Sequence, residues 1–294
     1  MESSDALILG GGFSGLACAT ALAQSGMRVT LLEKKPHLGG RAYSFRDPRT
    51  GETVDNGQHL FMGCYRHTRL FLRRIGAEHL LDFPGRVELH YADAEGRRDL
   101  LRLPWWAPAP VHLALGVAGL RGLSWTDKAA LWGLDRAVRR MNGASSTRSL
   151  DRQTVREWLN ALGQPARLQE RLFDPIVIGA LNELPERASA LGFAQVLREV
   201  FYRQRENSML GFARVGLSEL YVEQARVFIE GRGGRVLLNR KAARLVEEGG
   251  EVREVVMESG ERFVARTVVS SLPPWQLRRL ERSPALSGDW ISWN

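Results

Sequence analysis

The 294-residue sequence predicts an α/β fold, and three stretches of it carry that prediction. Residues 5–41 read as strand, glycine-rich turn, helix and strand, in that order. Residues 124–202 contain several helical patterns with start signals, and residues 236–271 return to strand patterns. A composition of 44% apolar and 25% charged residues is that of a soluble globular protein. A chain of this length is expected to hold two structural units.

The glycine-rich turn has the order of residues that binds a nucleotide. It follows a strand at 6–9, precedes a helix expected to end at Gln24, and reads Gly10-Gly11-Gly12-Phe13-Ser14-Gly15. Gly10 permits a tight turn, Gly12 lets the backbone approach a pyrophosphate, and Gly15 lets the helix pack close to the sheet. Amide groups at the helix start, from Phe13 and Ser14 onward, would face the phosphates.

A second strand, expected at 28–32, ends at Glu33. At that position a carboxylate can accept hydrogen bonds from both hydroxyls of an adenosine ribose, and an unphosphorylated ribose fits. The alternative is an ordinary turn between a strand and a helix. Because strand, helix, second strand and terminal acid all occur in the required order, we predict a Rossmann-like dinucleotide-binding unit.

The residues after Glu33 indicate which dinucleotide is bound. Lys34 and four further residues lead to Gly39-Gly40-Arg41, which gives the pattern E-x5-G-G-R. A second glycine pair lets backbone pass close to a cofactor, and Arg41 can neutralise phosphates; a simple loop is the alternative. The pattern resembles the flavoprotein form of the motif in the superfamily of amine oxidases and phytoene desaturases, whose cofactor is FAD. The resemblance implies FAD contacts from Gly10, Gly12, Phe13, Ser14, Gly15, Glu33, Lys34, Gly39, Gly40 and Arg41.

A more specific resemblance begins at residue 40. The segments G-R-A-Y-S-F (40–45), D-N-G-Q-H-L-F (55–61) and M-G-C-Y (62–65) resemble the squalene-associated FAD-dependent desaturases, also called hydroxysqualene dehydroxylases. The resemblance implies that Gly57, Gln58 and His59 lie near the flavin ring. His59 is the candidate catalytic residue, although a lone histidine is more often structural.

By the same resemblance, a mostly helical substrate domain (86–217) is inserted between two parts of an FAD-binding domain, 1–85 and 218–294. An amphipathic helix is expected at 68–81 and a hairpin of strands at 86–91 and 97–103. A helix is then expected to begin at a capping box, Ser124-Trp125-Thr126-Asp127, and a second, short helix at Thr154-Val155-Arg156-Glu157. Pro165 is expected to start a third helix, and residues 188–202 to form a fourth. This region carries no carboxylate pair, metal cluster or nucleophile with its base, so no metal site is predicted.

The apolar stretch 103–125 has two interpretations. Its three prolines and Arg121 exclude a clean spanning helix, which needs about twenty uninterrupted apolar residues. It is either a buried helix or the apolar wall and membrane-facing mouth of a pocket for a long hydrocarbon. In the second case Trp105 and Trp106 would lie at the membrane interface.

The last third of the sequence is expected to complete the FAD-binding domain. A helix at 217–229 precedes a strand at 236–238, and the family resemblance implies that Ala243 or Leu245 backs the adenine. A hairpin of 251–257 with 261–265 and a separate buried strand at 267–271 follow. Members of the superfamily continue beyond this point, so the chain is expected to lack the family's last glycine-rich segment.

Charge and cysteines narrow the choice of partners and compartment. The 41 basic and 33 acidic residues give a net charge of +8, but the arginines are dispersed and no nucleic-acid motif accompanies them. We interpret the charge as a solvated surface, with contact to an anionic membrane as the second possibility. Cys18 and Cys64 lack metal-ligand spacing, and the first strand begins too early for a signal peptide. A cytoplasmic protein, peripheral to the membrane at most, is expected.

The family resemblance also implies a reaction. It is redox chemistry on a C30 isoprenoid, most specifically the reductive removal of the hydroxyl of hydroxysqualene to give squalene, as in hopanoid biosynthesis. A phytoene-type carotenoid desaturase, with the opposite electron flow, is the alternative within the same fold. A non-catalytic flavin-binding or partner-binding fragment is the alternative from another class. The electron donor is not indicated by any motif.

Overall fold

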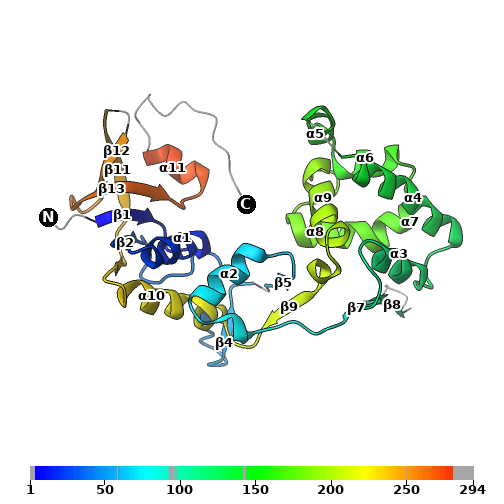
Figure 1. Cartoon of the computed structure of the whole chain (residues 1–294), viewed down its shortest axis with the longest axis horizontal. Coiled ribbons are helices and arrows are strands. Elements are labelled where there is room, and N and C mark those ends of the chain that lie inside the picture. Colours follow the sequence, from blue (N-terminus) through cyan, green and yellow to red (C-terminus); the bar gives the residue numbers. More distant parts are fainter. Residues whose placement is uncertain are drawn as a thin grey trace. The chain divides into compact units, whose positions relative to one another are not determined.

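The computed structural model describes residues 4–57, 59–92, 96, 98–141, 144–249 and 251–280, without the side chains of 144–147. The chain forms two compact units (Figure 1). The sheet unit comprises Met1–Leu60, Arg66–Asp82 and Phe212–Asn294, and the helical unit comprises Phe61–Tyr65 and Phe83–Gly211. Relative to the division made from the sequence, residues 61–65 and 83–85 lie in the helical unit and residues 212–217 in the sheet unit.

The sheet unit contains a six-stranded sheet in the order β10-β2-β1-β13-β12-β11. The first four strands are parallel and the last two continue antiparallel. In chain order the strands are β1 (Ser4–Leu9), β2 (Val29–Leu32), β10 (Arg235–Leu237), β11 (Ala242–Glu248), β12 (Glu251–Met257) and β13 (Arg262–Ser270). The order places β1 between β2 and β13, so that its carboxyl end lies in the interior of the parallel part.

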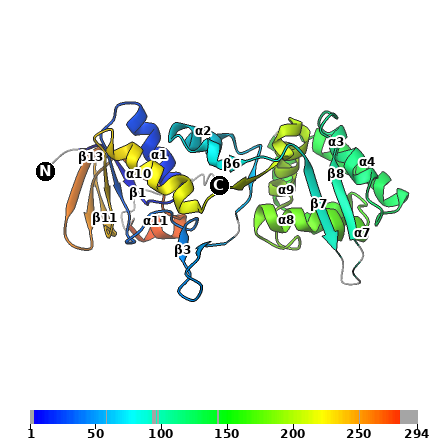
Figure 2. The same cartoon turned by 90° about the horizontal axis from the view of Figure 1, so that it is seen from below.

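The two faces of this sheet are covered by different elements. Leu7 and Leu9 of β1 belong to a core cluster with Val255 and Met257 of β12. The antiparallel strands β11 and β12 therefore pack over one face of the parallel part of the sheet. The alternate residues of β1, Ala6 and Ile8, are also fully buried. On their side of the sheet lie α1 (Phe13–Gln24) and α10 (Glu223–Glu230), which pack against each other, as Figures 1 and 2 both show.

Two expectations for this unit were wrong. The strands expected at 261–265 and 267–271 form the single strand β13, because no glycine or proline interrupts the chain between them. Its first part pairs with β12 and its second part with β1, and Thr267 and Ser270 are exposed rather than buried. The helix expected at 68–81 is α2 (Arg66–Arg74), which ends because Gly76 adopts a φ of 76°.

Shorter elements complete the sheet unit. After Gly76 the chain forms a 3₁₀ turn, η1 (Glu78–Leu80), and then a short strand, β6 (Leu81–Asp82). A hairpin of β3 (Ser44–Arg46) and β4 (Thr53–Asp55) follows the second glycine pair. The helix expected at 217–229 is a π-helical turn, η5 (Ser218–Val222), that continues into α10. The C-terminal part of the described chain ends in α11 (Pro274–Leu280).

The helical unit packs helices and one hairpin around a single apolar core. The hairpin pairs β7 (Val87–Ala92) with β8 (Arg98–Leu103). The two residues of β5 (Phe61–Met62) pair with the first half of β9 (Leu210–Ala213). The helical elements are α3 (Val111–Ala118), α4 (Trp125–Arg139), α5 (Ala144–Asp151), α6 (Val155–Ala161), α7 (Ala166–Leu168), η2 (Gln169–Phe173), α8 (Asp174–Leu181), α9 (Ala190–Leu197), η3 (Arg198–Tyr202) and η4 (Arg205–Ser208).

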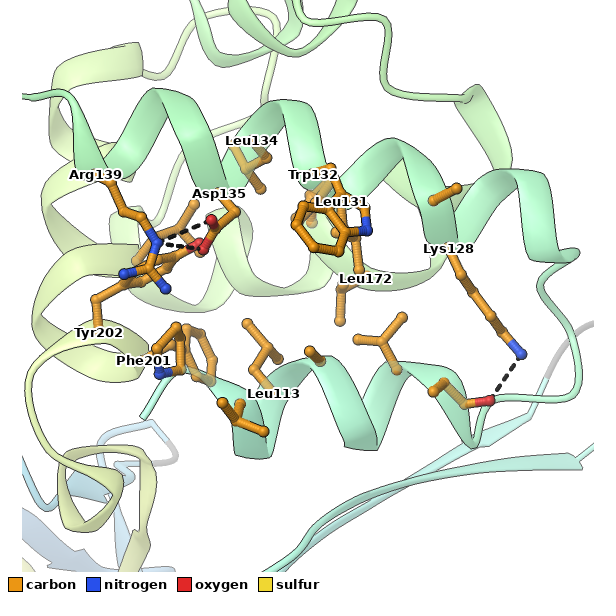
Figure 3. A pocket seen from close by; sticks show the side chains of 18 of the residues that line it. Leu113, Lys128, Leu131, Trp132, Leu134, Asp135, Arg139, Leu172, Phe201 and Tyr202 are labelled. Carbon is orange, nitrogen blue, oxygen red and sulfur yellow. Dashed lines mark hydrogen bonds and ion pairs between the residues drawn. The ribbon is translucent and has the colours of Figure 1, made fainter. Parts of the chain in front are cut away.

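Local signals set the starts of these helices. The expected capping box is present, since Ser124 and Asp127 exchange hydrogen bonds at the start of α4. Thr154 and Glu157 form a second capping box at the expected start of α6. Helices α3 and α4 border an apolar groove, which Figure 3 shows from close by.

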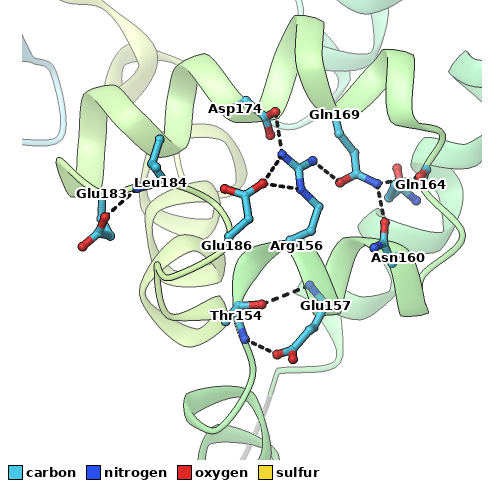
Figure 4. Close-up of polar contacts among 10 residues, drawn as sticks. All are labelled: Thr154, Arg156, Glu157, Asn160, Gln164, Gln169, Asp174, Glu183, Leu184 and Glu186. Atoms are coloured by element: carbon cyan, nitrogen blue, oxygen red, sulfur yellow. Dashed lines mark hydrogen bonds and ion pairs between the residues drawn. The ribbon is translucent and has the colours of Figure 1, made fainter.

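A network of hydrogen bonds around Arg156 joins α6 to the segment from η2 to α8 (Figure 4). The Arg156 guanidinium donates to Gln169 Oε1 at 2.6 Å, to Asp174 Oδ2 at 2.8 Å and to Glu186 Oε1 at 3.0 Å. Gln169, only 2% exposed, donates in turn to Asn160 Oδ1 at 2.9 Å. The planar guanidinium therefore satisfies two partly buried acceptors, on Gln169 and Asp174, while its third partner, Glu186, is more than half exposed.

We predict that Arg156→Leu lowers the free energy of unfolding by about 2–3 kcal/mol, because it leaves the hydrogen-bond acceptors of Asp174 and Gln169 unsatisfied in a partly buried site. Arg187→Leu is the matched control, since Arg187 pairs with Glu183 on the surface and its side chain is 70% exposed. The control should lose about 0.5 kcal/mol or less. Urea unfolding of the three proteins gives the comparison, and equal losses for the two variants contradict the assigned role of the network.

Candidate nucleotide-binding site

The first glycine turn joins β1 directly to α1 in the sheet unit. Gly10 adopts a φ of 102°, and its N–H donates to the Leu32 carbonyl at 2.8 Å, which ties the turn to the end of β2. A Cβ at Gly15 would overlap the carbonyl oxygen of Gly10. The third glycine is therefore needed because the first turn of the helix lies directly against the end of the strand.

Ser271, which follows β13, contacts the end of β1 and the start of the glycine turn. Its hydroxyl lies 2.9 Å from the Leu9 carbonyl oxygen and 3.0 Å from that of Gly10. Its backbone N–H also donates to Leu9 at 2.9 Å. Sequence reasoning did not identify Ser271 as part of the site, because nothing near residue 271 in the sequence marks this contact.

Glu33 is a buried carboxylate at the end of β2, only 6% exposed. Its Oε2 accepts from the Gly11 N–H at 2.7 Å, and its Oε1 accepts from the Lys35 N–H at 2.9 Å. A carboxylate has about four acceptor positions, so two remain for the two hydroxyls of a ribose. The backbone of Glu33 is itself fixed, since its N–H donates to Leu237 and its carbonyl accepts from Arg240.

The second glycine pair lies against the first glycine turn. The Gly39 N–H donates to the Gly11 carbonyl at 2.8 Å, and Gly12 and Gly39 form an isolated parallel bridge. A Cβ at Gly40 would lie 3.0 Å from Gly12 Cα, a distance that forces one of the two backbones to shift. The structure thus brings the two predicted glycine motifs together, backbone against backbone.

The N-terminus of α1 is open to an anion. Its N-cap is Gly12, no side chain caps the first turn, and no acidic residue lies in that turn. The backbone N–H groups there carry the positive end of the helix dipole. Such an uncapped helix start, beside a close approach of two glycine backbones, is chemically suited to a pyrophosphate.

Asn56 fixes the segment after Gly40 through two hydrogen bonds. The Asn56 side chain donates to the Arg41 carbonyl at 2.8 Å, and its backbone N–H donates to the Tyr43 carbonyl at 2.8 Å. Part of the D-N-G-Q-H motif therefore positions the G-G-R segment. Sequence reasoning missed this role of Asn56, because the two segments meet only through the β3–β4 hairpin.

The remaining predicted site residues occupy varied positions. The Phe13 ring packs against Phe71, with centroids 5.1 Å apart, so only its backbone faces the turn. Ser14, Lys34 and Arg41 are exposed, and Lys34 Nζ donates to Gln276 at 3.3 Å. Ala243 is exposed on β11, three positions after Arg240, which bonds to Glu33.

The residues expected near a flavin ring follow β4. Gly57 adopts a φ of 91°, and His59 is exposed with its Nδ1 2.8 Å from the Gly57 carbonyl oxygen. Gln58 lies outside the described residues. Among the residues that the structure describes, no group of three or more His, Cys, Asp or Glu side chains gathers where it could hold a metal ion.

The helical unit contains a separate apolar groove between α3 and α4, with a volume of about 470 Å³. Leucine, valine and aromatic side chains line it, and Lys128, Asp135 and Arg139 stand at its border (Figure 3). Arg139 Nε bonds to both carboxylate oxygens of Asp135, at 3.0 and 2.9 Å, so this pair largely neutralises itself. The groove can therefore accept an uncharged apolar chain.

The stretch 103–125 contains both buried and exposed apolar side chains. Helix α3 buries Val117 in the core while Val111 remains 46% exposed beside the groove. Trp105 and Trp106 are 62% and 65% exposed, in the loop between β8 and α3. Within the described part of the chain, every helix is too short or too polar to cross a bilayer.

Comparison with known proteins identifies the family. Residues 13–292 match the family described as flavin-containing amine oxidoreductases, and the chain belongs to this family. Family membership, together with a site built for an adenine dinucleotide, assigns FAD as the cofactor. The site fits FAD: Glu33 retains acceptor positions for a ribose, and the glycine backbones and the uncapped α1 offer N–H groups for a pyrophosphate.

Two of the relatives carry the names of enzymes that act on isoprenoids. The chain is 30% identical over 279 residues to the hydroxysqualene dehydroxylase of Sinorhizobium fredii, a match that covers 91% of this chain and 61% of that protein. It is 27% identical over 238 residues to a 15-cis-phytoene desaturase of Synechococcus elongatus, covering 79% and 48%. The chain thus spans about three-fifths or less of the length of these relatives.

Solved structures share the fold. An oxidoreductase from Methanosarcina mazei superposes with a TM-score of 0.69 at 15% identity, over 94% of this chain and 60% of that one. Cyclohexylamine oxidase from Brevibacterium oxydans superposes with a TM-score of 0.68 at 22% identity, over 95% and 60%. The α/β, Rossmann-like fold predicted from the sequence is confirmed.

We predict that Gly12→Val weakens FAD binding by about tenfold or more while the chain stays folded. Gly12 has an extended backbone, with φ of −81° and ψ of −175°, and a Cβ there meets only Gly40 Cα at 3.7 Å, so the fold has room for a Cβ at this position. The added atoms would occupy the space that a pyrophosphate needs. Fluorescence titration with FAD measures the affinity, and urea unfolding verifies that stability changes by about 1 kcal/mol or less.

Gly179→Val is the matched control for that experiment. Gly179 lies on the exposed side of α8, and a Cβ there meets nothing within 4 Å. This variant should bind FAD like the wild type. If Gly12→Val also binds FAD like the wild type, the pyrophosphate does not lie at Gly12.

Proposed function

We propose that this chain forms the FAD-binding and substrate-binding part of an oxidoreductase that converts hydroxysqualene to squalene. The observation that carries the proposal is the likeness to hydroxysqualene dehydroxylases along nearly the whole chain, including the segment that forms the nucleotide site. The apolar groove of the helical unit supports the substrate class, because a C30 isoprenoid offers almost no group that can be hydrogen-bonded.

The conversion consumes two electrons and two protons and releases one water. Bound FAD in its reduced form supplies the two electrons, as a hydride. The chain's residues hold the cofactor: Glu33 accepts from the ribose hydroxyls, and the backbones at Gly12 and Gly40 accommodate the pyrophosphate. Arg41, which is exposed and has its carbonyl fixed by Asn56, is positioned to neutralise phosphate charge.

His59 is the proposed proton donor for the leaving hydroxyl. A carbonyl oxygen only accepts, so the contact with Gly57 requires a proton on Nδ1. To protonate the leaving hydroxyl, His59 would start as the imidazolium, give up its Nε2 proton and keep the one on Nδ1. Gly57 and Gln58 would accompany it near the flavin ring. Ala243, in this proposal, lies on the adenine side of the cofactor.

The groove between α3 and α4 is the proposed binding region for part of the isoprenoid chain. Leu113, Leu131 and Phe201 are among its lining residues. Burial of apolar surface contributes about 25 cal/mol per Å² before ordering costs, and this is the main source of affinity open to such a substrate.

A phytoene-type desaturase is the second candidate, favoured by the likeness to 15-cis-phytoene desaturases. Direction of electron flow separates the two, because desaturation oxidises the substrate and dehydroxylation reduces it. A flavin-binding fragment without catalysis is the third, since the chain spans only part of its relatives.

We predict that the chain, joined to the C-terminal part of the Sinorhizobium relative, forms squalene from hydroxysqualene when its FAD is reduced with dithionite under argon. Phytoene with oxidised FAD should stay unchanged. Gas chromatography with mass spectrometry identifies the products, and Gly12→Val in the same fusion is the control. Desaturated phytoene products favour the second candidate, whereas FAD binding without any product favours the third.

We further propose that the loop carrying Trp105 and Trp106 contacts the membrane from which the substrate is collected. Both side chains are more than half exposed, and tryptophan prefers the interface between lipid and water. Basic residues near such a surface add about 1 kcal/mol each when the lipid is anionic.

Changing Trp105 and Trp106 together to Glu should release the protein from phosphatidylglycerol vesicles without altering the bound-flavin spectrum. Trp275→Glu is the matched control, because Trp275 is 60% exposed but lies on α11 of the sheet unit. The control should cosediment with vesicles as the wild type does. Unchanged cosedimentation of the double variant would falsify the membrane proposal.

A further inference from the structure

Tyr221 is a fully buried side chain whose hydroxyl reaches the second glycine motif. It lies on η5, is 0% exposed, and its Oη is 3.0 Å from the Gly39 carbonyl oxygen and also contacts the carbonyl oxygen of Ala42. The Ala42 N–H donates to the same Gly39 carbonyl at 3.0 Å and closes a turn over residues 39–42. The carbonyl oxygens of Gly39 and Ala42, which belong to one turn, therefore both lie against the Tyr221 hydroxyl.

The ring of Tyr221 contacts the other half of the site. Its centroid lies 4.7 Å from that of Phe13, the first residue of α1, and 6.1 Å from that of Phe71 of α2. One side chain thus touches both the element that begins at the first glycine turn and the turn that contains the second glycine pair. Burial raises the pKa of the Tyr221 phenol, so it remains a neutral hydrogen-bond donor at physiological pH.

The start of η5 is itself fixed to the β3–β4 hairpin. Ser44 and Ser218 exchange hydrogen bonds, each backbone N–H donating to the other's hydroxyl oxygen at 2.9 and 3.0 Å. The Leu217 N–H donates to Asp55 Oδ1 at 2.9 Å. A π-helical turn places Ser218 and Tyr221 so that both reach the segment after Gly39, and such turns are frequent at functional sites.

We propose that Tyr221 is a positioning residue for FAD, which sets the turn over residues 39–42 against the first turn of α1 before the cofactor binds. This inference rests on the assignment of FAD to the site. A turn with two positive-φ glycines has many conformations open to it, and ordering them at the moment of binding would lower affinity. The Tyr221 hydroxyl restricts the turn in advance.

Tyr221→Phe tests the inference, because it removes the hydroxyl and keeps the ring. We expect the Kd for FAD to rise about fivefold to twentyfold, the effect of one buried hydrogen bond. The Kd for ADP, which carries the adenine and pyrophosphate half alone, should rise by a similar factor. In the cofactor-free protein, the Ala42 amide should exchange with solvent faster in the variant than in the wild type, and saturating FAD should restore its protection.

Two further variants separate positioning from general stability. Tyr91→Phe removes a half-buried tyrosine hydroxyl from the helical unit and should leave both Kd values unchanged. Ser218→Ala keeps Tyr221 but weakens its attachment, and should raise the Kd for FAD by about twofold to fivefold even if Tyr221→Phe folds poorly. Urea unfolding of all variants identifies losses that are purely structural.

The outcomes are distinct. Wild-type affinity and wild-type exchange of Ala42 in both Tyr221→Phe and Ser218→Ala overturn the positioning role and leave the FAD assignment intact. Lower stability of these variants with unchanged Kd values also overturns it, since a merely structural residue behaves in that way. A wild-type chain that binds neither FAD nor ADP overturns the FAD assignment and this inference with it.

Discussion

The sheet unit depends on the close approach of two backbone segments at Gly12 and Gly40. A Cβ at Gly40 would lie 3.0 Å from Gly12 Cα, so this approach requires a residue without a side chain. It also determines where the end of β1, the first turn of α1 and the segment after Glu33 must lie. The hydrogen bonds from Gly39 to Gly11 and from Gly11 to Glu33 tie these segments together. The cradle that we propose for the pyrophosphate lies beside this approach.

The local half of this site could be predicted from the sequence, and the distant half could not. Strand, glycine turn, helix and terminal acid lie within forty residues and follow rules of local geometry, so the positions of Gly10, Gly12 and Glu33 in the fold could be predicted directly. Asn56, Ser271 and Tyr221 act through contacts between distant segments, and Tyr221 bonds to a residue 182 positions earlier in the chain. No periodicity or spacing signals such a contact, because it exists only once the sheet has formed.

The helical unit shows the same division between local and distant effects. Capping boxes at Ser124 and Thr154 begin helices as expected, since each involves only four consecutive residues. Helix ends and strand continuity were less predictable: Gly76 ends α2 early, and β13 runs unbroken because both of its neighbours, β12 and β1, supply partners. The Arg156 network depends on packing and left no trace in the sequence pattern, whereas an apolar pocket wall was one of the two interpretations of the stretch that contains α3.

The cofactor site is completed only by residues from the last part of the chain, which also complete the sheet. Residues 83–211 intervene before η5 and β13 contribute Tyr221 and Ser271, so the early glycine motifs are supported only after the chain returns. The entropy cost of closing a long loop grows slowly with its length, which is why an insertion of this size is tolerated. A ligand that binds only the completed site stabilises it by RT ln(1 + [L]/Kd). FAD therefore stabilises contacts formed by both ends of the sheet unit, and the cradle and the sheet are expected to form as one cooperative structure.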